Sequence, residues 1–65
     1  MTILPHALKR ARQTAGLSQP QLAKLARVST GYIGMLETGT RLHPSAAIVE
    51  RLAAALDIEI SQLGV

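Results

Sequence analysis

The charged side chains of this chain are mostly basic, and the basic ones lie mainly in residues 1–45. That part holds six Lys and Arg residues and a single acidic residue, Glu37, so its net charge is +5. Residues 46–65 hold Arg51 and three acidic residues, a net charge of −2. This asymmetry predicts that residues 1–45 contact a polyanion, the alternative being an ordinary basic surface. The six basic residues are Lys9, Arg10, Arg12, Lys24, Arg27 and Arg41.

Other kinds of chemistry find little support in the residue types. The chain has no cysteine, which excludes disulfides and thiolate metal sites. His6 and His43 are isolated from each other and from other ligand types, so we expect no metal site. No nucleophile with a base and an orienting group can be identified, nor a Gly-rich phosphate loop. We therefore expect neither an enzyme nor a cofactor-binding protein.

Length and composition limit the architecture. With 65 residues the chain predicts a single domain, residues 1–65. No apolar run approaches the roughly 20 residues of a membrane span, and the N-terminus has no signal-peptide core. We expect a soluble, cytoplasmic protein that does not contact membranes. Tyr32 is the only aromatic residue among 48% hydrophobic residues, so the core must be aliphatic.

Capping signals divide the chain into five short helices. Pro5 suits the first turn of a helix that Gly16 terminates. Ser18 and Gln21 have the spacing of a capping box at the start of the next helix. Ser29 and Ser45 are further candidate N-caps. The predicted helices span about residues 5–15, 18–26, 29–38, 45–56 and 59–63.

Apolar spacing assigns a buried face to each helix. The predicted inward residues of the first three helices and the fourth are Leu8, Ala11 and Ala15; Leu22, Leu25 and Ala26; Ile33 and Leu36; and Ile48, Val49, Leu52, Ala53 and Leu56. Only about three residues join the second helix to the third, which predicts the steep crossing of a helix-turn-helix. Residues 39–44 predict a loop. The fold class is therefore all-α.

The order and spacing of several short motifs resemble one family of DNA-binding domains. These motifs are "GLSQ" at 16–19, "LA" at 22–23, "VS" at 28–29, "YI" at 32–33, "LETG" at 36–39, "PS" at 44–45 and "LAAALDI" at 52–58. Together they resemble the phage repressor and Cro type of helix-turn-helix domain, the XRE family, which is lambda-repressor-like in fold. The resemblance covers about residues 6–63. It implies a DNA-binding transcriptional regulator, typically a repressor that binds a palindromic operator as a homodimer.

The resemblance also implies roles for individual residues. Residues 18–26 would position the domain on DNA, and residues 29–38 would enter the major groove. Ser18 and Gln19 would meet a phosphate at the start of the positioning helix, although Gln19 could equally be a solvated first-turn residue. Arg12 and Glu37 match a structural ion pair of the family, so truncating Arg12 should destabilise the fold.

The predicted base-reading face departs from the common family pattern. At about 100° per residue, one face of helix 29–38 points away from Ile33 and Leu36. It lacks the long polar side chains that usually contact base edges. Hydroxyl, apolar and backbone contacts remain possible there, and the glycines would allow close approach to the groove. Alternatively, this face does not read sequence. Its residues are Thr30, Gly31, Gly34, Met35 and Thr38.

Further candidate contacts lie beside this face and near the C-terminus. Arg41 and His43 are candidate phosphate contacts in the loop, and the Tyr32 hydroxyl is another unless Tyr32 packs beside Val28. The apolar residues at the end of the chain predict a dimer seam, unless they only close the monomer core. These are Ile58, Ile60, Leu63 and Val65. The alternative function is a protein-interaction module, antitoxin-like or co-activator-like, because Gly31, Gly34 and Met35 also suit helix packing against a protein.

Overall fold

The computed structural model describes residues 1–64. Four α-helices are followed by one short 3-10 turn, in the order α1 (Pro5–Thr14), α2 (Gln19–Ala26), α3 (Thr30–Thr38), α4 (Ala46–Leu56) and η1 (Ile60–Leu63). No strand occurs within these 64 residues, and the all-α prediction is confirmed. None of their helices is long and apolar enough to cross a membrane.

The predicted fifth α-helix is wrong, because residues 60–63 form the 3-10 turn η1. Its backbone bonds run from the Gln62 N–H to the Glu59 carbonyl and from the Gly64 N–H to the Ser61 carbonyl, both three residues apart. Gly64 then takes a left-handed conformation with φ of 87°, which ends the turn. A segment this short cannot complete the i to i−4 bonds of an α-helix.

Local capping chemistry sets the starts of three helices. The Ser18 hydroxyl accepts from the Gln21 N–H at 3.2 Å, and the Ser18 N–H donates to Gln21 Oε1 at 2.8 Å. This is the predicted capping box. Ser29 and Ser45 accept from the backbone N–H three residues ahead in the same way. Each of these serines is the residue before its helix, so the helices begin one residue later than predicted.

The core is built from aliphatic side chains alone, as the sequence predicts. Each of the four helices contributes to it, and so do η1 and the segment before α1. The fully or almost fully buried residues are Ile3, Leu8, Leu22, Ala23, Ala26, Ile33, Leu36, Val49, Leu52, Ala53, Leu56 and Leu63. Ala11 and Ile48 are half-buried and pack against them.

Two predicted core residues point to solvent instead. Leu25 is 57% exposed, whereas its neighbour Ala23 is buried. The inward stripe of α2 consists of Leu22, Ala23 and Ala26, and Leu25 lies about 100° from the centre of that stripe around the helix axis. Ala15 is also exposed, because it is the C-cap of α1 rather than part of its inward face.

Residues 1–4 form a connection that the periodicity of the sequence does not reveal. The Ile3 side chain is completely buried. Its N–H donates to the Leu42 carbonyl at 3.0 Å, and the Leu4 N–H donates to the Leu63 carbonyl, also at 3.0 Å. This segment therefore ties the loop after α3 to η1.

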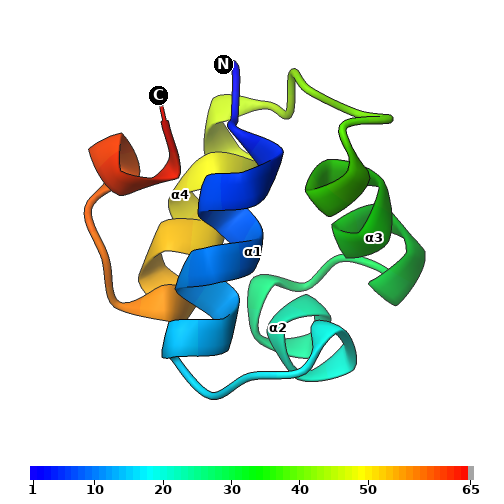
Figure 1. Cartoon of the computed structure of the whole chain (residues 1–65), viewed down its shortest axis with the longest axis vertical. Coiled ribbons are helices and arrows are strands. Elements are labelled where there is room, and N and C mark those ends of the chain that lie inside the picture. Colours follow the sequence, from blue (N-terminus) through cyan, green and yellow to red (C-terminus); the bar gives the residue numbers. More distant parts are fainter. Residues whose placement is uncertain (65) are drawn as a thin grey trace.

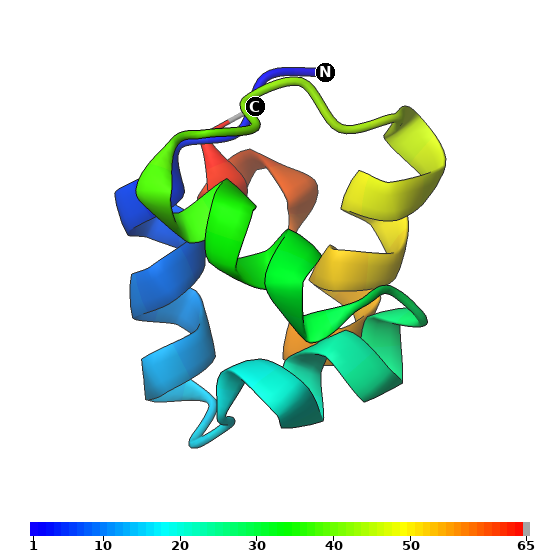
Figure 2. The same ribbon diagram turned by 90° about the vertical axis from the view of Figure 1, so that its right-hand side faces the viewer.

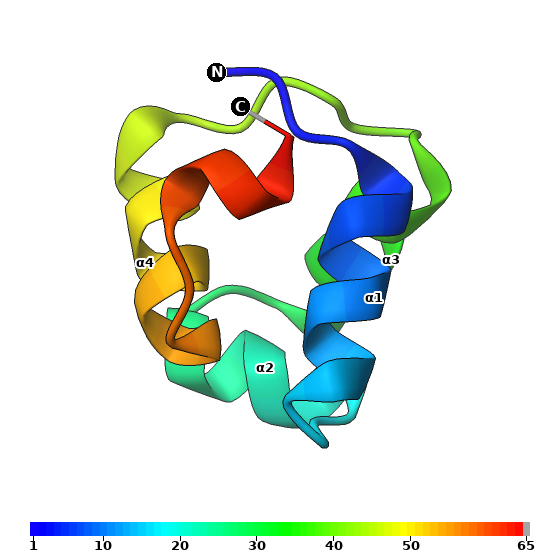
Figure 3. The same cartoon turned by 60° about the vertical axis from the view of Figure 1, so that its left-hand side comes forward.

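The helices are arranged so that α3 lies at the edge of the molecule. Figure 1 shows α3 on one side of α1 and η1 on the other. Turned by 90°, α3 runs across the side that faces the viewer, with α2 below it (Figure 2). In the opposite rotation, η1 and the end of α4 come forward while α3 lies behind α1 (Figure 3). One face of α3 is thus left without a partner in the chain.

Candidate nucleic-acid interface

The outward face of α3 is open to contacts from outside the chain. Thr30, Gly31 and Thr38 are exposed, and Gly34 and Met35 are half-buried. Ile33 and Leu36, on the other face, are completely buried. The structure therefore brings the five predicted base-reading residues onto one accessible surface. Their contact with bases stays a prediction.

The fold itself does not require glycine at positions 31 and 34. A Cβ atom added at either residue would have no neighbouring atom within 4 Å. Both residues also have ordinary helical backbone angles, in contrast to Gly39 at the end of α3, where φ is 86°. A requirement for glycine at these two positions must therefore come from a binding partner, if it exists.

A buried ion pair lies on the inner side of α3. Arg12 Nε donates to Glu37 Oε2 at 2.6 Å, and Arg12 Nη2 donates to Glu37 Oε1 at 3.1 Å. The Arg12 and Glu37 side chains are only 12% and 2% exposed. Arg12 Nη1 also donates to the Leu17 carbonyl at 2.8 Å. The predicted pair is thus present as a two-bond contact that joins α1 to α3.

The pair keeps both residues charged. Burial by itself would raise the pKa of Glu37. Hydrogen bonds from Arg12 and Gln19, with the nearby charges of Arg12 and Lys9, outweigh burial and lower this pKa below its ordinary value. The hydrogen bond to Glu37 conversely raises the pKa of Arg12. The carboxylate is therefore an acceptor at all pH values near neutrality.

Gln19 belongs to the same cluster, which sequence reasoning missed. Gln19 Nε2 donates to Glu37 Oε1 at 3.1 Å, and the residue is half-buried. The alternative of a freely solvated first-turn side chain does not describe this geometry. No pattern in the sequence signals the contact, since it depends on how α2 and α3 cross. Whether Gln19 also meets a phosphate stays a prediction.

The other candidate phosphate contacts lie around α3. Ser18, Arg41 and His43 are exposed. The Arg41 N–H donates to the Met35 carbonyl at 3.1 Å, so the loop folds back onto the end of α3. His43 Nδ1 lies 3.2 Å from Thr2 Oγ1.

Tyr32 is half-buried and packs against the aliphatic core, and Val28 packs against the same core. This burial agrees with the packing role that the sequence left open. A phosphate contact of the Tyr32 hydroxyl is neither required nor excluded by it.

The predicted dimer seam needs correction. Leu63 is completely buried in the core of its own chain, because η1 folds it inward, so it has no surface to offer a partner. Val65 lies outside the described residues. Ile58 and Ile60 are half-buried and keep part of their side chains accessible.

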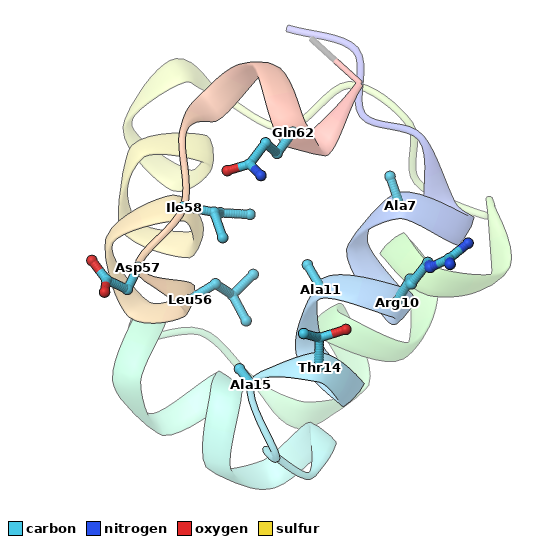
Figure 4. A pocket seen from close by; sticks show the side chains of 9 residues that line it. All are labelled: Ala7, Arg10, Ala11, Thr14, Ala15, Leu56, Asp57, Ile58 and Gln62. Carbon is cyan, nitrogen blue, oxygen red and sulfur yellow. The ribbon is translucent and has the colours of Figure 1, made fainter.

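Ile58 also lines a groove of about 520 Å³ between α1 and the end of α4. In this groove Arg10 and Asp57 lie on opposite sides (Figure 4). Within residues 1–64 no set of three His, Cys, Asp or Glu side chains comes together to hold a metal.

Comparisons with known proteins agree with this geometry. A family model described as a helix-turn-helix domain matches residues 4–63. The restriction-modification controller protein C.AhdI from Aeromonas hydrophila is 39% identical, with a TM-score of 0.85 over 91% of this chain and 88% of that one. SinR, the Bacillus subtilis master regulator for biofilm formation, solved in complex with DNA, is 28% identical, with a TM-score of 0.88 over 92% of this chain and 98% of that one.

A third solved structure is the clp gene regulator ClgR from Corynebacterium glutamicum. It is 29% identical, with a TM-score of 0.84 over 91% of this chain and 62% of that one. A search of curated protein sequences gave no significant match.

Proposed function

Since the chain belongs to the helix-turn-helix domain family, in its phage repressor and Cro type, we propose that this DNA-binding regulator is a sequence-specific repressor that binds a palindromic operator as a homodimer. The observation that carries the proposal is the accessible outer face of α3, next to a positioning helix that is fixed to α3 through Glu37. SinR, which matches 92% of this chain, was solved with DNA bound.

The proposal places α3 in the major groove. Thr30 and Thr38 can offer hydroxyls to base edges, and Met35 can contact a thymine methyl group. Gly31 and Gly34 add no bulk, so the helix backbone can approach the bases closely. With few long polar side chains on α3, part of the specificity would come from the shape of the DNA.

Phosphate contacts would flank the groove. Gln19 lies at the first residue of α2, where backbone N–H groups and the helix dipole favour an anion. Arg41 and His43 lie in the loop after α3 and would follow the backbone on the other side, as would Ser18 and Tyr32 near the helix starts. These contacts fix the position of the domain and do not select a sequence.

The homodimer would form through the part of the surface around Ile58 and Ile60, which lies away from α3 (Figure 3). Two copies related by a twofold axis would place their reading helices about 34 Å apart, one turn of DNA. The palindromic operator follows from that symmetry.

Binding to duplex DNA at increasing salt tests the proposal against a protein-directed function. We expect the affinity to fall steeply with salt, because phosphate contacts release counterions. Arg41→Ala should weaken binding and reduce the slope of log K against log salt by about 1. Arg10→Ala, in the groove away from α3, is the matched control and should leave the slope unchanged. Absence of binding at low salt would favour the protein-interaction module.

A further inference from the structure

The contact between Gln19 and Glu37 determines which atoms of Gln19 face outward. An ionised carboxylate only accepts hydrogen bonds, so the side chain facing Glu37 must present its amide nitrogen. The Gln19 Nε2 to Glu37 Oε1 distance of 3.1 Å shows this arrangement. An NH₂ group carries two hydrogens, and this contact uses one. Within residues 1–64 the second hydrogen has no acceptor.

The surroundings of Gln19 make this second hydrogen valuable. Pro20 has no N–H, and the Gln21 N–H is already bound by the Ser18 hydroxyl. The next N–H, of Leu22, donates to the Ser18 carbonyl. The first turn of α2 therefore offers an anion few backbone donors besides the N–H of Gln19. A phosphate at this point depends on the Gln19 side chain.

Glu37 is well suited to hold that side chain still. Its carboxylate receives two hydrogen bonds from Arg12 and one from Gln19, and its side chain is only 2% exposed. Arg12 is itself anchored on the Leu17 carbonyl, two residues before Gln19. The cluster thus links the start of α2 to the end of α3 through groups that cannot rotate freely.

We infer that Glu37 is a positioning residue for DNA binding, which orients the Gln19 amide so that its second N–H donates to a phosphate oxygen. The inference rests on the proposed function. Its consequence is that the phosphate contact on α2 is set in register with the reading helix α3. A preoriented donor loses less conformational freedom on binding than a mobile one.

A double-mutant cycle on DNA affinity tests the coupling, with Gln19→Ala, Glu37→Gln and the double variant. Gln19→Ala should weaken binding of the parent chain by about tenfold, the loss of one charge-assisted hydrogen bond. In the Glu37→Gln background the new amide can donate toward Gln19 and turn its oxygen inward. There Gln19→Ala should weaken binding by less than about twofold. Gln13→Ala, an exposed α1 residue, is the control and should have no effect in either background.

Equal losses in the two backgrounds would overturn the inference while leaving DNA binding intact. A parent chain that does not bind DNA at all would instead overturn the proposed function. If Glu37→Gln fails to fold, side-chain amide NMR of the parent chain gives the answer. One Gln19 amide proton should be shifted and slowly exchanging without DNA, and the other should shift when a duplex is added. Two Gln19 protons that behave like those of Gln13 would contradict the inference.

Discussion

Arg12 is the residue on which the fold depends most among the basic side chains. Within residues 1–64 it makes the one Lys or Arg ion pair, and its partner Glu37 is almost completely buried. Arg12→Ala would leave that carboxylate buried without a counter-charge, which costs about 3 kcal/mol or more. In a domain of this size that corresponds to roughly 12–24 °C in Tm.

A thermal-melt scan of alanine variants at all seven Lys and Arg positions checks this prediction. Arg51→Ala should rank second, because Arg51 Nε donates to the Ala26 carbonyl at 2.8 Å, a neutral partner. Arg10→Ala represents an exposed control. An Arg12→Ala variant that melts together with the exposed ones would contradict the account.

The same pair predicts how stability depends on pH. The pKa of Glu37 is lower in the folded chain than the value of about 4.3 for unfolded Glu, so its contribution is present above the unfolded pKa. That contribution is lost as the pH falls through the folded-state pKa. We expect the Tm of the parent chain to drop more below about pH 4 than that of Glu37→Gln. Calorimetry from about pH 2 to 7 measures both; parallel curves would contradict the prediction.

At the residue scale, the sequence predicts contacts that a family pattern or local chemistry specifies. The Arg12–Glu37 pair followed from the resemblance, and the Ser18–Gln21 box from spacing alone. The Gln19–Glu37 bond could not be predicted, since it joins residues 18 positions apart across a helix crossing. Its existence depends on the angle between α2 and α3, which no local pattern encodes.

At the scale of helices and turns, starts and stops are readable because they are local. Ser29 and Gly39 bracket α3 through an N-cap bond and a left-handed residue. The buried faces are less readable. Leu25 was predicted inward because Leu at i+3 usually continues a stripe, yet α2 buries the small Ala23 instead. Ile3 was missed because residues 1–4 have no periodicity.

The glycines of α3 yield a prediction in which stability and binding move in opposite directions. Gly31→Ala and Gly34→Ala should each stabilise the fold by about 0.5–1 kcal/mol, because the added methyl group meets no atom of the chain. If the helix lies close to the groove floor, each should weaken DNA binding by roughly tenfold.

The measurements are the free energy of unfolding in urea and the affinity for operator DNA. Ala54→Gly, at an exposed position of α4, is the control: it should lose comparable stability without changing the affinity. Glycine variants of α3 that bind as tightly as the parent would rule out the close approach.

At the scale of the whole molecule, α3 and η1 lie on different sides of α1, so DNA binding and dimerisation would use separate surfaces (Figure 1). Residues 1–4 connect them, through the bonds of Ile3 to Leu42 and of Leu4 to Leu63. The end of the chain was predicted to be a seam, but burial of Leu63 shows that part of it closes the monomer core.

The dimer is tested at Ile58. Ile58→Arg should shift the chain toward monomer in sedimentation, since a charge would have to be buried in an apolar seam. Its affinity for a full palindrome should then fall toward the affinity for a single half-site. Leu25→Arg is the matched control, because Leu25 is 57% exposed on another surface. A parent chain that is monomeric both free and on DNA would contradict the homodimer.

The central claim is that α3 reads a DNA sequence, and selection of bound duplexes from a random pool tests it most directly. The account predicts enrichment of a palindrome whose half-site centres are about 10 base pairs apart. The enriched sequence should lose its advantage when the half-sites are scrambled. A pool that shows no enrichment after selection at low salt would contradict the claim.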